Sequence, residues 1–303
     1  MSSVAYLNGE YLALAEARVP VTDRGFLFGD GIYEVIPIYE GCPFELERHL
    51  QRLQRSLAEI GLGRQPLLME LDLERVIEQL IRENGLSRAS CYIQITRGPS
   101  MPRDHRFPAD AVPTVFAMLQ PLAQVAPGVL EHGVQAVTQP DLRWARSVIK
   151  STSLLANVLA KQSAHEAGAE EAILIRDGEV IEGAAMSVFI AGPGEIATPP
   201  VRPEMLQGVT QQLVLELARE RLAAAWGLSV SERPIGENEL SQVDEIWLTS
   251  STREVIPVTR LDGRPVGSGR PGPIWSAMWD LMQERKAICA QTPVIPRAHR
   301  PMG

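Results

Sequence analysis

The sequence predicts an α/β protein of the α+β type with two domains, and three observations support this fold class. The 303 residues suit one large domain or two domains of roughly 150 residues. Strand-like alternation and helix-like three- and four-residue spacing of apolar side chains occur in both halves of the chain. Between the halves, residues 119–128 contain Pro121 and Pro127 and have the composition of a linker.

The first half predicts a small N-terminal domain, residues 1–120. Asn8-Gly9 between two short apolar segments indicates a hairpin. Residues 32–39, 91–96 and 114–118 have the residues and alternation of strands. Leucine and isoleucine at three- and four-residue spacing predict a helix over residues 46–60, and a second helix is predicted over residues 71–83, ending near Asn84-Gly85.

The second half predicts a linker over residues 121–133 and a larger domain over residues 134–285. Strands are expected at residues 134–137, 172–175, 188–191 and 245–249, and helices at residues 210–225 and 274–282. Residues 286–303 hold three prolines and little periodicity, so we expect a flexible tail there.

Composition excludes several classes of protein. A net charge of −8 with no basic stripe argues against nucleic acid as a partner. The N-terminus lacks the charge and apolar core of a signal peptide, and no apolar run approaches the roughly 18 residues of a membrane span. Cys42, Cys91 and Cys289 are an odd number without metal spacing, which favours reduced thiols and a cytoplasmic location. The five scattered histidines predict no metal site.

Lysine is rare in this chain, which has only Lys150, Lys161 and Lys286 against 26 arginines (29 − 3). Lysine can form a Schiff base after losing its proton, whereas arginine cannot. Lys161 falls on the polar side of an amphipathic helical segment, and Lys286 stands among charged residues, so both are interpreted as surface residues. Lys150 follows apolar Val148 and Ile149 and is the best candidate for chemistry.

Three further segments suggest one ligand. Glu182-Gly183 places a carboxylate at the end of a short apolar strand, and Gly208-Val209-Thr210 begins an amphipathic helix whose N–H groups suit a phosphate. Residues 249–252 supply four hydroxyl groups in a row. Each signal alone is compatible with an ordinary turn or helix cap. Together with a reactive lysine they fit pyridoxal phosphate, which needs a phosphate site, a lysine and an acid for its ring nitrogen.

The chain resembles the fold-type IV pyridoxal-phosphate enzymes over nearly its whole length. The resemblance rests on Asp23-Arg24-Gly25, on residues 28–34 and 49–53, and on Ile149-Lys150-Ser151, Glu182-Gly183, residues 208–210 and residues 249–252. Within that group, residues 96–108 resemble the D-amino acid aminotransferases, which hold a substrate carboxylate with an Arg-x-His pair such as Arg103 and His105. The resemblance implies a small α/β domain followed by a larger domain with a mixed, barrel-like sheet.

The resemblance also implies roles for single residues. Lys150 would form the internal aldimine and move the proton between the substrate α-carbon and the cofactor C4′. Glu182 would pair with the pyridine nitrogen. The phosphate would be held by Arg52, by the Val209 and Thr210 N–H groups and by the Ser251 hydroxyl. The substrate carboxylate would be received by Tyr33, Arg103 and His105. Because the Arg-x-His loop reaches the partner subunit's site in related enzymes, a homodimer is implied.

Two positions depart from the pattern of this group. After Glu182-Gly183 the group has a hydroxyl-rich stretch that ends in asparagine, whereas this chain has Ala184-Ala185-Met186-Ser187. That change bears on substrate range and on cofactor affinity. Arg253 adds a cation beside the hydroxyl run, and it either binds a substrate side-chain carboxylate or points to solvent.

The expected activity is therefore transamination of D-amino acids such as D-alanine with a 2-oxo acid such as 2-oxoglutarate. A branched-chain L-aminotransferase and an (R)-selective amine transaminase are alternatives with the same fold, and the Arg103/His105 pair argues against both. Aminodeoxychorismate lyase and a pyridoxal-phosphate-binding protein without turnover are further alternatives.

Overall fold

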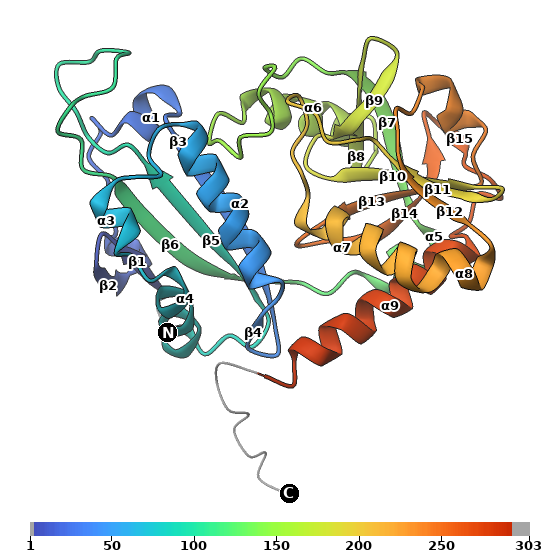
Figure 1. Cartoon of the computed structure of the whole chain (residues 1–303), viewed down its shortest axis with the longest axis horizontal. Helices are drawn as coiled ribbons and strands as arrows, with labels where there is room; N and C mark the ends of the chain where they lie inside the picture. The colour runs from blue at the N-terminus through green and yellow to red at the C-terminus, as the bar shows by residue number, and fades with distance from the viewer. Residues whose placement is uncertain (1–2, 293–303) are drawn as a thin grey trace, which may run out of the picture. The chain divides into compact units, whose positions relative to one another are not determined.

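The computed structural model describes residues 3–292 and divides into two compact units. The first unit comprises residues 1–123, 149–153 and 286–303, and the second comprises residues 124–148 and 154–285. Residues 149–153, with Lys150, thus belong to the first unit, although the sequence assigned them to the large domain. Figure 1 follows the chain through both units.

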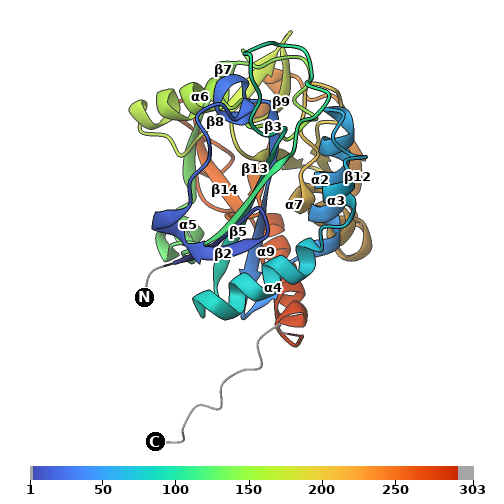
Figure 2. The ribbon, with the colours of Figure 1, turned by 90° about the vertical axis from the view of Figure 1, so that its left-hand side faces the viewer.

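A six-stranded sheet forms the first unit, with strand order β2-β1-β6-β5-β3-β4. Helix α2 packs against β3, and helix α4 packs against β1 and β6 (Figures 1 and 2). The elements are β1 (Val4–Leu7), β2 (Glu10–Ala13), a 3-10 turn (Leu14–Glu16), α1 (Arg24–Phe28), β3 (Gly31–Tyr39), β4 (Cys42–Pro43), α2 (Leu46–Glu59), α3 (Pro66–Met69), α4 (Leu73–Asn84), β5 (Ala89–Thr96) and β6 (Thr114–Pro121).

The sequence pattern explains these elements well. The predicted hairpin forms with Asn8 and Gly9 at positive φ (51° and 101°), as a tight antiparallel turn requires. The apolar face of α2 buries Leu53 and Leu57 against the sheet, and α4 buries Ile77 and Leu80. Gly85 then ends α4 in the left-handed conformation (φ 62°), close to the predicted stop.

The second unit contains a curled mixed sheet with strand order β12-β11-β10-β13-β14-β7-β8-β9, and β15 pairs with β14. Because β9 at one end also contacts β10 within the sheet, the sheet curls as a partial barrel (Figure 1). This confirms the expected barrel-like core, which Ile190, Ile246 and Leu248 help to fill.

The strands of the second unit are β7 (Val134–Pro140), β8 (Glu171–Arg176), β9 (Glu179–Gly183), β10 (Ser187–Gly192), β11 (Glu195–Thr198), β12 (Ser229–Glu232), β13 (Glu245–Ser250), β14 (Glu254–Leu261) and β15 (Arg264–Pro265). The helices are α5 (Pro127–His132), α6 (Leu155–Glu166), α7 (Val209–Leu217), a π-type turn (Ala218–Leu222), α8 (Ala223–Trp226), a 3-10 turn (Glu237–Ser241) and α9 (Pro273–Cys289).

Several boundaries differ from the sequence expectation. A short helix, α5, forms within the predicted linker, where Pro127 provides a favourable first helical position. Strand β14 was not predicted. It contains Pro257, and proline is uncommon in inner strands. The pairing of β14 with β7 shifts register between Val258 and Arg260. Helix α9 continues to Cys289, so the predicted tail was wrong over residues 286–289. Residues 293–303 lie outside the described part.

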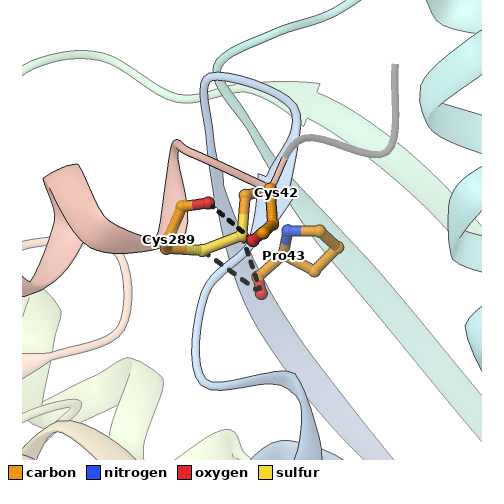
Figure 3. Close-up of a disulfide and its surroundings, with 4 residues drawn as sticks. Cys42, Pro43 and Cys289 are labelled. Atoms are coloured by element: carbon orange, nitrogen blue, oxygen red, sulfur yellow. Dashed lines mark hydrogen bonds between the residues drawn. A yellow bond between two sulfur atoms is a disulfide. The ribbon is translucent and has the colours of Figure 1, made fainter. Parts of the chain in front are cut away.

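The cysteine prediction was wrong in part. Cys42 and Cys289 form a disulfide with their Cα atoms 5.9 Å apart (Figure 3). Cys91 is a buried free thiol. The two sulfurs meet because Cys42 begins β4 and Cys289 ends α9, although 247 positions separate them in the sequence. Among the helices of residues 3–292, none combines the length and apolar character needed to cross a membrane.

Candidate active site

Lys150 is held by its backbone between β3 and α2 of the first unit. Its carbonyl accepts a hydrogen bond from the Tyr33 N–H (2.9 Å), and its own N–H donates to the Ser56 hydroxyl (3.2 Å). Ser151 extends the attachment by bridging Ile32. Gly29 permits this packing, because a Cβ there would collide with the Ser153 side chain. The lysine is therefore fixed at its Cα while its side chain extends from the edge of β3.

The Lys150 amine has few partners. Its Nζ lies 4.2 Å from the centre of the Tyr33 ring, and within residues 3–292 it makes no hydrogen bond and no ion pair. The Tyr33 ring in turn stacks on Tyr92, with ring centres 5.8 Å apart. The structure thus brings the predicted lysine together with one predicted substrate-binding residue and leaves the amine available for a covalent bond.

Arg52, predicted to bind phosphate, forms a buried cluster with Glu34 and His49. Its Nε and Nη2 donate to the two Glu34 oxygens at 2.8 and 2.5 Å, and His49 Nδ1 lies 3.0 Å from Glu34 Oε1. Burial alone would raise the pKa of Glu34, but Arg52 and His49 outweigh it and hold that pKa far below its usual value. Burial lowers the pKa of His49. Glu34 therefore stays ionised and fixes the Arg52 guanidinium.

Arg103 and His105, the predicted carboxylate pair, share one aromatic platform. The Arg103 guanidinium lies 4.4 Å from the centre of the Phe28 ring, and the His105 ring lies 5.2 Å from it. Phe28 is the last residue of α1, and the Arg103 and His105 side chains are both exposed. The structure thus brings these two predicted residues together, whereas Tyr33 has the separate set of neighbours described above.

In the second unit, the buried Glu182 carboxylate is bound by Arg143, a residue that the sequence reasoning missed. Arg143 Nη1 and the Leu206 N–H (3.1 Å) both donate to Glu182 Oε1. Within residues 3–292, Oε2 has no hydrogen-bond partner. Burial raises the pKa of Glu182, and the Arg143 guanidinium opposes that rise. The site therefore presents one free oxygen of a buried acid.

A second acid orients Arg143. Asp141 accepts from its Nε (2.9 Å) and Nη2 (2.9 Å), and Arg176 also pairs with Asp141 (3.0 Å). Charged residues directly after strand β7 were the available sequence signal. That signal does not name Glu182 as the partner, because 39 positions separate Arg143 from it.

The N-terminus of α7 has the geometry of an anion site. Val209 and Thr210 are its first two residues, and their N–H groups have no partner within the helix, as at any helix start. The preceding Gly208 lies close to Ser187, because a Cβ there would stand 2.7 Å from the Ser187 hydroxyl. Beside Ser187 on the neighbouring strand is Thr249, whose buried hydroxyl lacks a hydrogen-bond partner within the described residues.

Ser251 and Arg253 lie in the turn between β13 and β14. The Ser250 hydroxyl accepts from the Arg253 N–H (3.2 Å), which tightens the turn. Arg253 Nη1 pairs with Glu170 at 2.8 Å, with both side chains about one-third exposed. In the described chain its guanidinium is therefore engaged by an acid of the same unit.

The Ala184–Met186 segment, whose sequence departs from the related enzymes, is anchored at both ends. Asn157 of α6 donates to the Ala184 carbonyl (2.7 Å). The buried Glu171 accepts from the Ala172 N–H (2.9 Å) and from the Ala185 backbone, and burial raises the pKa of this acid. The Gly183 N–H bonds the Met186 carbonyl (2.6 Å), which closes the turn. The segment is thus ordered without hydroxyl side chains.

The other two lysines have structural contacts. Lys161 Nζ reaches the Glu170 carbonyl and lies 3.5 Å from Glu171 Oε2. Lys286 Nζ lies 4.3 Å from the centre of the Tyr39 ring. Lys150 therefore differs from Lys161 in having an amine without a carbonyl or carboxylate partner among the described residues.

These residues fit pyridoxal phosphate. The first unit offers a lysine with an available amine. The second offers a buried acid with a free oxygen, helix N–H groups and an unpaired buried hydroxyl, which match the needs of a ring nitrogen and a phosphate.

The chain belongs to the class IV amino-transferases, a family that residues 31–261 match. It is an aminotransferase with the fold-type IV architecture. It is 43% identical to a D-alanine aminotransferase of Bacillus licheniformis over 276 residues, which cover 91% of this chain and 94% of that protein. A D-alanine aminotransferase of Listeria monocytogenes is 36% identical over 282 residues, with 92% and 94% covered.

Solved structures of branched-chain aminotransferases share the fold. The enzyme of Escherichia coli superposes with a TM-score of 0.81 at 25% identity, covering 94% of each chain. The enzyme of Thermoproteus uzoniensis, solved with norvaline, gives 0.79 at 26% identity, covering 97% of this chain and all of the other.

Proposed function

We propose that this chain is a pyridoxal-phosphate-dependent transaminase of D-amino acids such as D-alanine, with a 2-oxo acid such as 2-oxoglutarate as amino acceptor. The observation that carries the proposal is the pairing of Arg103 with His105 on Phe28, which offers three or more donors to a carboxylate. The D-alanine aminotransferases that the chain resembles over about nine-tenths of its length support the same substrate class.

The cofactor supplies an aldehyde for a lysine amine and a ring that withdraws electrons from the substrate α-carbon. Lys150 would hold that aldehyde through its amine, and the same amine would accept the proton from the substrate α-carbon. Its backbone bonds to Tyr33 and Ser56 fix the point from which the amine extends, which limits the positions that the amine can take.

The remaining residues bind and orient. Glu182 would accept a hydrogen bond from the ring nitrogen at its free Oε2, and the Arg143 guanidinium opposes the rise that burial causes in the pKa of this acid. The phosphate would be held by Arg52, by the N–H groups of Val209 and Thr210 and by the Ser251 hydroxyl, to which we add the Thr249 hydroxyl, which is unpaired within the described residues. Tyr33, Arg103 and His105 receive the substrate carboxylate.

A homodimer is part of the proposal, and the surface of α6 supports it. Leu155, Val158 and Leu159 lie at helical spacing on one face and are 71, 58 and 62% exposed. Leu142 and Trp144 of the same unit are also exposed. Exposed apolar side chains at such spacing are typical of a protein interface.

Sedimentation of the holoenzyme tests this assembly. The wild type should sediment as a dimer, and Leu159→Glu should shift it to monomer, whereas Val201→Glu, an exposed apolar residue outside α6, should not. A monomeric wild type would contradict the proposal.

A cytoplasmic location belongs to the same proposal. The redox state of the Cys42–Cys289 pair tests this location. A reducing cytoplasm should keep part of the pair as thiols, which rapid alkylation in intact cells should label. Complete protection of both cysteines in cells would argue for an oxidising compartment.

A branched-chain L-amino acid transaminase is the second candidate, since the solved structures above carry that activity in their names. Reaction of the holoenzyme with single amino donors separates the two candidates. D-alanine should convert the bound cofactor, and conversion by L-leucine alone would replace our proposal with this one.

A further inference from the structure

Asp30 joins two buried arginines in the first unit. Its Oδ2 accepts from Nε of Arg24 (2.8 Å) and from Nε of Arg97 (2.8 Å), and Arg97 Nη2 also donates to Oδ1 (3.1 Å). Both arginines are only 3% exposed, so water does not screen them well. A single carboxylate therefore lies between two cations that would otherwise repel each other at close range.

The outer ends of these arginines hold the loop that carries Arg103 and His105. Arg24 Nη1 donates to the Asp104 carbonyl (2.6 Å), and its Nη2 donates to the His105 carbonyl (3.2 Å). The Arg97 guanidinium stacks on the Phe107 ring at 3.5 Å from its centre. Arg24 thus binds the loop backbone, and Arg97 contacts the Phe107 side chain of the same loop.

Arg24 also contributes to the platform beneath the carboxylate pair. Its guanidinium lies 4.8 Å from the centre of the Phe28 ring, which Arg103 and His105 also contact. Arg97 is fixed at a further point, because its Nη2 donates to the Ile60 carbonyl (2.6 Å). The position of the loop therefore depends on guanidinium groups whose own orientation Asp30 sets.

We propose that Asp30 is a positioning residue for substrate binding: through Arg24 and Arg97 it holds the loop so that Arg103 and His105 can receive a carboxylate. This inference rests on the proposed function, because it assumes that the pair binds a substrate carboxylate. Asp30 itself touches neither the substrate nor the reacting atoms in this account. Neutralising it should change the binding of carboxylates and leave the cofactor chemistry of Lys150 intact.

The test uses the holoenzyme and its Asp30→Asn variant. We expect the Kd of propionate, a carboxylate without an amino group, and the KM of D-alanine to rise by about tenfold or more, the equivalent of about 1.4 kcal/mol. The turnover number with saturating D-alanine should change far less. Reaction with (R)-1-phenylethylamine, an amine without a carboxylate, should proceed at its wild-type rate, however slow that rate is.

A readout without turnover accompanies the kinetics. Amide hydrogen exchange over residues 101–107 should be faster in Asp30→Asn than in the wild type, with or without cofactor. Asp30→Glu, which keeps the charge, should restore part of the propionate affinity. Glu195→Gln is the matched control: it also removes a carboxylate that pairs with an arginine, Arg233, but it lies in the second unit and should leave all these values unchanged.

Phe107→Ala gives a second variant if Asp30→Asn does not fold. Phe107 is 63% exposed, so its removal should spare the fold while releasing the Arg97 contact, and propionate affinity should again fall. Unchanged affinity for propionate in a folded Asp30→Asn protein would overturn the inference. So would an equal loss of reaction rate with D-alanine and with (R)-1-phenylethylamine. A wild type that neither binds propionate nor reacts with D-alanine would instead overturn the proposed function.

Discussion

Arg143 donates a hydrogen bond from Nη1 to Oε1 of Glu182, and both side chains are buried in the second unit. The guanidinium opposes the rise that burial causes in the pKa of Glu182. It also leaves Oε2 without a partner among the described residues. The pair therefore supplies a buried acid, placed beside a fixed cation, whose second oxygen can bind a protonated ring nitrogen, which is the electrostatic requirement of this cofactor.

Replacing Arg143 by methionine should raise the pKa of Glu182 further, because the guanidinium is the main group that opposes the effect of burial and only the Leu206 N–H then remains. We expect transaminase activity at pH 7 to fall by at least about tenfold and to recover partly as the pH is raised, which pH–rate profiles would measure. Arg176→Met is the control, since Arg176 bonds Asp141 and not Glu182. Profiles of identical shape for Arg143→Met and wild type would refute the role of Arg143.

Lys150→Ala should keep its fold and lose its transamination. The amine makes no hydrogen bond or ion pair within residues 3–292, so its loss should change the free energy of unfolding by less than about 1 kcal/mol. The rate should fall by about 100- to 10,000-fold, as for removal of a proton-transfer group. Unfolding in urea and turnover assays measure the two effects, with Lys161→Gln as the control. Substantial turnover by Lys150→Ala would contradict the assignment.

The Glu34 cluster should make the protein sensitive to acid. The pKa of Glu34 is lowered on folding, so its contribution to stability is present above its ordinary value of 4.5 and is lost as the pH falls below it. The lowered pKa of His49 acts in the same direction, beginning below its ordinary value of 6.5.

Glu34→Gln should therefore be less stable than wild type at pH 7, by about 3–5 kcal/mol because Arg52 loses the Glu34 carboxylate, and the gap should narrow as the pH falls below 4.5. Urea unfolding at several pH values measures the difference. A gap that stays constant from about pH 5 down to about pH 2 would show that Glu34 does not titrate as described.

The disulfide predicts the number of free thiols. Denatured protein without reductant should react with a thiol reagent at one cysteine, Cys91, and at all three after reduction. Cys42→Ser should lower the free energy of unfolding by about 2–5 kcal/mol, because a long loop is no longer closed. Finding three reactive thiols before reduction would mean that the disulfide does not form in the purified protein.

The sequence predicts local elements because their patterns are local. The alternation in residues 32–39 and the leucine spacing in α2 both reflect burial against one face, and each formed as predicted. Strand β14 was not predicted from its pattern; it includes Pro257, a residue uncommon in inner strands, and its pairing with β7 is irregular between Val258 and Arg260. The fold class followed from the local elements together with the resemblance to a known family.

Contacts between distant segments could not be predicted in the same way. The spacing of residues in the sequence does not indicate the attachment of Lys150 to β3 or the pairing of Arg143 with Glu182. The Cys42–Cys289 disulfide is the clearest case, because bonding depends on the distance between the two Cα atoms in space and the sequence gives only their separation along the chain. The resemblance supplied candidate residues, and the structure added Arg143, Thr249 and Asp30.

The most direct measurement adds single amino donors to the holoenzyme without any 2-oxo acid and follows the absorbance of the bound cofactor. D-alanine should convert the cofactor to its amino form, while L-leucine and (R)-1-phenylethylamine should do so far more slowly. The reaction should also depend on Arg103, because Arg103→Ala should raise the D-alanine concentration needed without lowering cofactor content. Rapid conversion by L-leucine and none by D-alanine would contradict the account.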